Sequence, residues 1–95
     1  MKTLKRVPVD LIVLEHGEYM PEKMEFGKIY YSPQFKGSSH LCLCGCGHKC
    51  YLPINEGEWS LSANEKGDVS IYPSIQQRFE CKSHYVIKNG KANFV

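Results

Sequence analysis

The segment from His40 to Cys50 carries most of the side chains in this chain that can bind a metal ion. It reads His-Leu-Cys-Leu-Cys-Gly-Cys-Gly-His-Lys-Cys and holds four of the five cysteines and two of the four histidines among 95 residues. The fifth cysteine, Cys81, stands in Cys-Lys-Ser-His. Thiolate and imidazole are ligands that zinc prefers, and glycine lets a backbone curl around an ion. The segment therefore predicts a metal site, which would restrict the chain to folds that bring Cys81 beside it.

Cysteines at alternate positions suit a shared metal better than a disulfide. In an extended strand, the Cα atoms of residues i and i+2 lie roughly 6.6 Å apart, which is near the upper limit for a disulfide. Two thiolates on one zinc ion, each about 2.3 Å from the metal, tolerate that spacing. Cys42 and Cys46 would lie roughly 13 Å apart in a straight strand, so they can share one metal only if the chain bends. Gly45 and Gly47 permit such a bend.

A single structural zinc ion is the predicted cofactor. The chain has enough thiolates to close all four positions of a zinc ion, whereas a catalytic zinc keeps one position for water. We therefore expect a structural site that ties two distant parts of the chain together. The predicted ligands are Cys42, Cys44, Cys46 and Cys81. Three further residues compete for places in the ligand set, namely His40, His48 and Cys50.

Length and charge narrow the class of protein. Ninety-five residues without a repeat or a linker predict one domain, residues 1–95, with a modest core that a metal would help to stabilise. The net charge is only +2, from 12 basic and 10 acidic residues, so we expect no nucleic-acid partner. The apolar run Val9–Leu14 is short and contains Asp10, so we expect neither a signal peptide nor a membrane span. An odd number of cysteines then favours a cytoplasmic chain with reduced thiols.

Short apolar segments separated by turn residues predict a mostly β fold, a small antiparallel sheet or barrel-like domain. Two segments that flank the turn residues 64–67 alternate between polar and apolar side chains and predict a hairpin. The residues expected on the core face of that hairpin are Trp59, Leu61, Val69 and Ile71. The predicted strands are residues 7–14, 28–31, 38–43, 49–52, 58–62, 68–72, 83–87 and 91–95. Pro73 is expected to end its strand, and residues 74–80 could hold a short helical turn.

A serine and two histidines form a second group of interest. Ser74 follows Pro73, so we expect it on a sharp, exposed turn, and a nucleophilic serine needs such exposure and a nearby imidazole. If Cys81 binds the metal, His84 is held close to it, and His40 would face the same side of its strand as the first loop cysteine. The spacing thus brings Ser74 and both imidazoles together. The same residues also fit a turn serine and a strand histidine, because the chain has no Gly-x-Ser-x-Gly elbow and no identifiable acidic third member.

Taken in order, these motifs resemble a family of small bacterial zinc-binding domains long labelled as being of unknown function. The shared pattern is His-x-Cys-x-Cys-Gly-Cys-Gly at residues 40–47, Trp-x-Leu at 59–61, Pro-Ser-Ile at 73–75 and Cys-x-Ser-His-Tyr at 81–85. A glycine before a Tyr-containing strand, at residues 27–31, and Leu52-Pro53 complete the pattern. The resemblance covers most of the chain from about residue 20 onward, and the rarity of the cysteine motif makes it specific.

The resemblance implies a peptidase. Similar proteins occur in bacterial ubiquitination-like (Bub) operons, which are defence operons, beside ubiquitin-like, E1-like and E2-like proteins. The family looks like the component that processes or removes the ubiquitin-like protein. This implies that Ser74 attacks the substrate carbonyl with His84 as general base, and with His40 as the alternative base or as the group that orients the imidazole. The implied substrate is the flexible C-terminal tail of the ubiquitin-like protein or its conjugates, laid along an exposed strand edge. E1-like and E2-like proteins are further implied partners.

The chain departs from the family pattern near the implied active residues. Gln76-Gln77-Arg78 stands where the family has Gly-Asn-Trp, Val86 stands where a Trp is usual, and Cys50 is unusual at its position. These departures bear on substrate specificity and leave the predicted zinc ligands intact. Two other functions stay open. The chain could be a non-catalytic, zinc-stabilised protein-interaction module, or a zinc metallohydrolase in which water occupies the fourth metal position.

Overall fold

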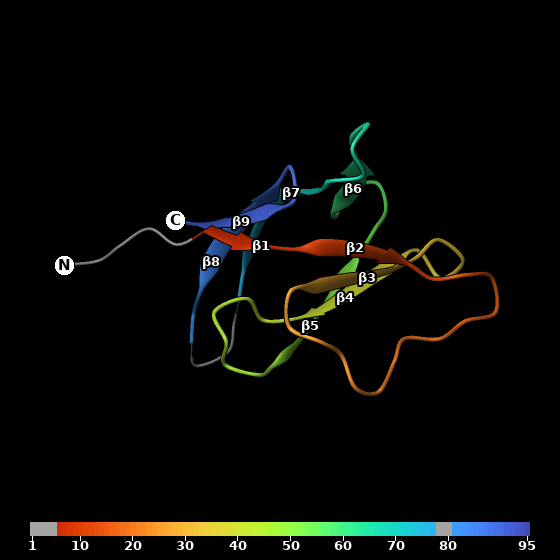
Figure 1. Cartoon of the computed structure of the whole chain (residues 1–95), viewed down its shortest axis with the longest axis horizontal. Coiled ribbons are helices and arrows are strands. Elements are labelled where there is room, and N and C mark those ends of the chain that lie inside the picture. The colour runs from red at the N-terminus through yellow and green to blue at the C-terminus, as the bar shows by residue number, and fades with distance from the viewer. Residues whose placement is uncertain (1–5, 78–80) are drawn as a thin grey trace.

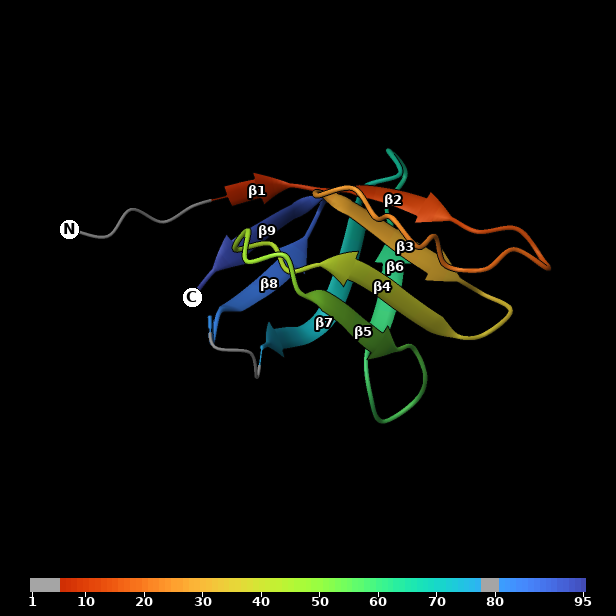
Figure 2. The ribbon, with the colours of Figure 1, turned by 90° about the horizontal axis from the view of Figure 1, so that it is seen from below.

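The computed structural model describes residues 6–77 and 81–95. These residues form nine strands and no helix, arranged as a five-stranded sheet and a four-stranded sheet that pack together (Figure 1 and Figure 2). The mostly β fold predicted from the sequence is confirmed. Within these two ranges, the chain has no helix of the length and apolar character that crossing a bilayer requires.

The five-stranded sheet is antiparallel, in the order β1-β9-β8-β7-β6. Its strands are β1 (Arg6–Pro8), β6 (Ser60–Ala63), β7 (Val69–Gln76), β8 (His84–Lys88) and β9 (Lys91–Phe94). The hairpins β6–β7 and β8–β9 are those expected from the sequence. Between β8 and β9, Asn89 and Gly90 have positive φ angles of 50° and 78°, which is the conformation that a tight hairpin turn requires.

The four-stranded sheet has the order β2-β3-β4-β5. Its strands are β2 (Asp10–Val13), β3 (Lys28–Ser32), β4 (Gly37–Leu41) and β5 (Lys49–Pro53). β2 pairs with β3 in the parallel direction, so this sheet is mixed where an antiparallel one was expected. A parallel pair needs a long connection, and the polar, turn-rich residues 14–27 supply it.

The single strand predicted at residues 7–14 is divided between the two sheets. β1 ends at Pro8 and pairs with β9, whereas β2 begins at Asp10 and pairs with β3. Val9 lies buried between them, and its N–H donates to the Gly90 carbonyl at 2.9 Å. The chain therefore passes directly from an edge of one sheet to an edge of the other and links them on that side (Figure 2).

The prediction that Pro73 ends its strand is wrong, because β7 continues to Gln76. The pairing of β7 with β8 shifts register between Ile71 and Ile75. Proline has no N–H to donate and is tolerated where ladder pairing is irregular, which accounts for its place here. The helical turn expected at residues 74–80 is wrong for 74–76, which are strand, and residues 78–80 lie outside the described part.

The core lies between the two sheets. Ile29 and Leu52 of the four-stranded sheet belong to one apolar cluster with Ile71, Tyr85 and Ile87 of the five-stranded sheet, and each is at most 2% exposed. The residues predicted to share the core face of the β6–β7 hairpin all join this cluster, namely Trp59, Leu61, Val69 and Ile71. Burial of one face of each sheet leaves the other face of the five-stranded sheet available for a functional site.

Candidate functional site

The cysteine-rich segment between β4 and β5 forms a tight loop. The Cys42 N–H donates to the His48 carbonyl at 2.8 Å, and the Gly45 N–H donates to the Cys42 carbonyl at 3.1 Å. Gly45 and Gly47 have φ angles of 94° and 89°, in the left-handed region that favours glycine. The bend predicted from the cysteine spacing is therefore confirmed.

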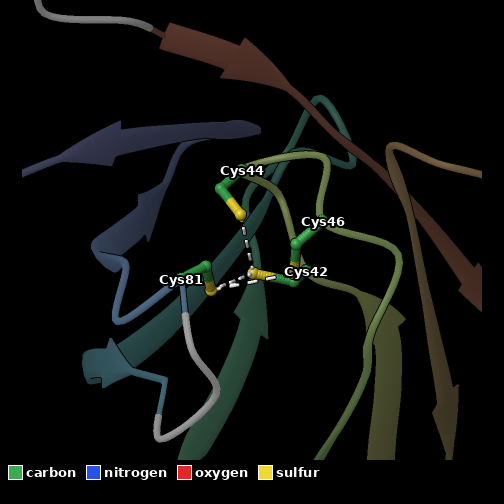
Figure 3. A group of neighbouring side chains, drawn as sticks. All are labelled: Cys42, Cys44, Cys46 and Cys81. Carbon is green, nitrogen blue, oxygen red and sulfur yellow. Dashed lines mark hydrogen bonds between the residues drawn. The ribbon is translucent and has the colours of Figure 1, made fainter.

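Four sulfur atoms meet beside this loop, as Figure 3 shows. The Sγ atoms of Cys42, Cys44, Cys46 and Cys81 all lie within 4.8 Å of one another. Cys42 Sγ is 3.5 Å from Cys44 Sγ and 3.8 Å from Cys81 Sγ. Cys46 Sγ is 3.7 Å from Cys81 Sγ. Sulfurs bound tetrahedrally to one metal at about 2.3 Å would be about 3.8 Å apart, so this four-cysteine cluster could hold one metal ion.

Cys81 reaches the cluster from the connection between β7 and β8, close to Ser83. The Ser83 Oγ lies 3.4 Å from Cys81 Sγ and 3.2 Å from Cys42 Sγ. Hydrogen bonds from the Ser83 side chain and backbone lower the pKa of Cys81 to about 6, because they stabilise its thiolate. Burial instead raises the pKa of the Cys42 thiol. The cluster thus includes a thiol that ionises readily, and metals bind the thiolate form.

The three competing ligand candidates lie outside this group of four. His48 Nδ1 is 3.3 Å from Cys46 Sγ, at the side of the cluster. His40 and Cys50 are buried opposite each other on β4 and β5. Within the described residues, the sulfurs that gather closely enough for one metal are those of the four cysteines predicted from the sequence.

Ser74 and His84 form a hydrogen-bonded pair. His84 Nε2 lies 2.8 Å from Ser74 Oγ, and both side chains are half-buried. Gln76 lies opposite His84 in the β7–β8 ladder, and Ser74, two residues before Gln76, faces the same side of the sheet. Ile75 and Tyr85 are buried on the other side. The pair therefore lies on the outer face of the five-stranded sheet, within a strand and not on the exposed turn expected from the sequence.

This pair has the arrangement that nucleophilic catalysis requires. An imidazole within hydrogen-bonding distance of a serine hydroxyl can remove the serine proton as the oxygen attacks a carbonyl. Among the residues that the structure describes, no carboxylate hydrogen-bonds the His84 ring, and we refer to Ser74 and His84 as the dyad.

The four-cysteine cluster and the dyad share one short stretch of chain. Cys81 is three residues from His84 in the sequence, with Ser83 between them in contact with two of the clustered sulfurs. The Gln77 N–H donates to the Ser83 carbonyl at 2.8 Å, which extends the β7–β8 ladder toward the cluster. Holding Cys81 in place therefore also holds the start of β8, where His84 lies.

His40 lies in the core. Its Nε2 is 2.8 Å from the Tyr85 hydroxyl, and that hydroxyl also accepts a hydrogen bond from Gln77 Nε2 at 2.8 Å. Burial lowers the pKa of His40 to about 4, so the ring is neutral near pH 7. The structure brings Ser74 to His84, but among the described residues no hydrogen bond joins His40 to either of them.

Three residues at this site had no role assigned from the sequence, namely Ser83, Tyr85 and Gln77. The contact of Ser83 could have been predicted from the sequence, because a hydroxyl two residues after a ligand cysteine can reach its thiolate. The contacts of Tyr85 with His40 and with Gln77 could not have been predicted, since they depend on how the chain packs in three dimensions.

Comparison with known proteins places the chain in a family. No curated protein and no solved structure gives a match. One family model matches residues 16–95, a range that contains the four-cysteine cluster and the dyad, and its description is bacterial ubiquitination-like system serine protease (BubE). The resemblance seen in the sequence motifs is thereby confirmed. The chain belongs to the family of bacterial ubiquitination-like system serine proteases, BubE.

Proposed function

We propose that this protein is a serine peptidase that processes a bacterial ubiquitin-like protein or removes it from its conjugates. The observation that carries the proposal is the 2.8 Å hydrogen bond between Ser74 Oγ and His84 Nε2, in a chain of a serine protease family. The substrate is the ubiquitin-like protein of the same system, and E1-like and E2-like proteins are its further partners. Reduced thiols at the four-cysteine cluster suit a cytoplasmic protein.

Ser74 and His84 divide the chemistry between them. Ser74 Oγ attacks the carbonyl carbon of the scissile bond while its proton passes to His84 Nε2, which must be unprotonated at that moment. The bond to the leaving group then breaks, and the proton on His84 Nε2 passes to the leaving group. In the second half, His84 takes a proton from water, the resulting hydroxide attacks the acyl-serine, and the proton returns to Ser74 Oγ.

We propose one structural zinc ion at the four-cysteine cluster. Zinc is the metal most often held by four thiolates, and the sulfur separations of 3.5, 3.7 and 3.8 Å suit tetrahedral coordination. When bound, the ion supplies a cross-link between the β4–β5 loop and the connection between β7 and β8. Four thiolates leave no position for a water, which favours this role over a metallohydrolase.

Cleavage assays with single variants test the peptidase. We expect Ser74→Ala and His84→Gln each to lower kcat/KM for a purified ubiquitin-like conjugate by at least about a thousandfold, because each removes one partner of the dyad. Ser62→Ala is the matched control, since Ser62 is an exposed serine on β6 of the same sheet. Circular dichroism and zinc content verify the fold of each variant. Cleavage by Ser74→Ala at the wild-type rate would exclude the serine mechanism.

The same assay separates the two candidate bases. If His84 is the base, His40→Gln retains substantial activity in protein that is folded and zinc-loaded. If His40 is the base, His40→Gln shows the loss expected of Ser74→Ala, and His84→Gln does not. A fluorophosphonate probe provides an independent readout, because it labels an activated serine and mass spectrometry locates the label at Ser74.

A further inference from the structure

β7 extends past its neighbour β6 beside the dyad. The β6–β7 ladder ends where Ser60 lies opposite Tyr72, whereas the β7–β8 ladder continues to Gln76 opposite His84. Ile75 and Gln76 therefore have partners on β8, and, within the described part of the chain, residues 73–76 have no strand partner on the other side. We call this stretch the open edge, and the nucleophile Ser74 belongs to it.

The backbone groups of Ser74 and Gln76 point away from β8. The Gln77 N–H donates to the Ser83 carbonyl, so Gln77 belongs to a hydrogen-bonded pair of the β7–β8 ladder. In an antiparallel ladder such pairs alternate with pairs whose N–H and C=O groups point outward. Counting back along β7, Gln76 is an outward position, and the Ser74 C=O also points outward, because it lies opposite the inward N–H of Ile75 in one planar peptide group. The open edge therefore presents the N–H and C=O groups of Gln76 and the C=O group of Ser74.

We propose that the substrate binds at the open edge as an added β-strand whose backbone pairs with Ser74 and Gln76. This rests on the proposed peptidase function and specifies the form of the substrate, which is an extended, flexible peptide segment. Outward N–H and C=O groups at every second residue match the backbone of another extended chain. Because the nucleophile belongs to the pairing strand, the carbonyls of the added strand pass beside the Ser74 side chain.

The side chains at the open edge leave room for a bound strand. Side chains of an added strand alternate between the two faces of the sheet, and those on the outer face would lie beside Tyr72 and Gln76. The Tyr72 side chain is 75% exposed, and Gln76 is exposed as well. Backbone pairing thus supplies the binding, and a target that offers only folded surface near its scissile bond is not cleaved.

N-methylation of a substrate peptide tests the added strand without changing the protein. The probe is a fluorescein-labelled synthetic peptide of the C-terminal tail of the ubiquitin-like protein of the same system, bound to Ser74→Ala so that no cleavage intervenes. In an added strand only every second N–H points to the open edge. We expect N-methylation to weaken binding about tenfold at alternate positions and to have little effect at the positions between them. Equal effects at all positions, or none at any, would overturn the proposal.

Gln76→Pro tests the same pairing from the protein side. Proline removes the outward N–H, and it is tolerated where a strand N–H does not serve the ladder. Gln76→Ala is the matched control, because it also removes the side chain and keeps the N–H. Ala63→Pro is a second control on β6, an edge strand of the same sheet away from the dyad. In the Ser74→Ala background, we expect the peptide Kd of Gln76→Pro to be about tenfold above that of Gln76→Ala, and Ala63→Pro to leave the Kd within about twofold.

Failure of this proposal is distinguishable from failure of the proposed function. If Gln76→Pro and Gln76→Ala bind the peptide equally while Ser74→Ala abolishes cleavage, the open edge is wrong and the peptidase stands. If N-methylation weakens binding only at alternate positions while Ser74→Ala still cleaves at the wild-type rate, strand addition at the open edge is supported and the serine mechanism is wrong. The peptide scan decides the matter even if Gln76→Pro does not fold.

Discussion

Tyr85 is the residue on which the buried polar contacts between the two sheets converge. Its hydroxyl is 2.8 Å from both His40 Nε2 and Gln77 Nε2. A glutamine amide nitrogen can only donate, so the hydroxyl accepts from Gln77. In the His40 tautomer with no proton on Nε2, the hydroxyl donates to that nitrogen. The three side chains are at most 6% exposed. One hydroxyl therefore satisfies two polar groups that the core would otherwise leave without a partner.

Tyr85→Phe removes this hydroxyl and leaves two buried nitrogen atoms without it. We expect the free energy of unfolding, measured by urea denaturation, to fall by about 2–4 kcal/mol. Tyr72→Phe is the matched control, because Tyr72 is 75% exposed, and it should cost less than about 0.5 kcal/mol. A loss for Tyr85→Phe no larger than that of the control would mean that the hydroxyl contributes nothing to holding His40 and Gln77.

At the residue scale, side-chain type and spacing were enough to predict which cysteines gather. Three cysteines spaced closely around two glycines are typical of a metal site, and Cys81 is the remaining cysteine outside that segment. Cys81 was therefore predicted as the fourth ligand, and its sulfur lies with the other three. The contact of Ser74 with His84 was expected, but His40 was expected there as well. Local spacing could not separate the two imidazoles, because the side chain of His40 meets Tyr85 across the core. That contact depends on how the two sheets pack together, which cannot be predicted from a local sequence motif.

At the scale of elements, the β8–β9 turn connects three parts of the fold. The Gly90 carbonyl accepts a hydrogen bond from the Val9 N–H, and the Gly90 N–H donates to the Val69 carbonyl. Gly90 has a φ angle of 78°, and a Cβ placed there would lie 3.2 Å from the Asp68 carboxylate. Both the backbone conformation and the neighbouring side chain therefore favour glycine at this turn.

Gly90→Ala is expected to lower the free energy of unfolding by about 1–3 kcal/mol, since it adds crowding to the cost of a left-handed residue. Gly57→Ala is the matched control. Its φ angle is 86°, but nothing lies within 4 Å of a Cβ placed there, so it bears the conformational cost alone. Thermal unfolding of both variants checks the difference, and a Gly90→Ala protein as stable as wild type would contradict this account of the turn.

Most strands were predictable from the alternation of apolar residues and from turn signals, and two boundaries were not. The apolar run 7–14 has no break of its own. Where it changes sheets is decided by the carbonyls of Gly90 and Gly27, which accept the N–H groups of Val9 and Asp10. Pro73 is an equally strong stop signal by local rules, yet β7 passes through it, because the ladder with β8 resumes at Ile75 after a register shift. Distant pairing partners outweighed the local signal in both cases.

At the scale of the whole molecule, the four-cysteine cluster links the two sheets. Its loop follows β4 of the four-stranded sheet, and Cys81 precedes β8 of the five-stranded sheet. The β1–β2 segment provides another link between them. A metal at the cluster therefore restrains the relative position of the sheets as well as the start of the strand that carries His84.

Removal of the proposed zinc should unfold or loosen the whole protein. We expect a chelator to lower Tm by more than about 10 °C and to abolish cleavage, because several kcal/mol of metal-binding free energy contribute to folding. Added zinc should restore both properties. The matched control is Cys81→Ser, whose Tm the chelator should hardly lower. An unchanged Tm after metal loss verified by elemental analysis would contradict a structural role for the ion.

The pairing of β1 with β9 also sets the order in which a newly made chain can be completed. Val7 lies opposite Ala92, so a strand synthesised early waits for one synthesised late. Until β9 leaves the ribosome, β1 lacks its partner and β8 has one neighbour in place of two. An incomplete product that stops before Lys91 therefore lacks β9 and the Val95 N–H that donates to the His84 carbonyl, so β8 has a strand on both sides of the proposed active site only after β9 has been made.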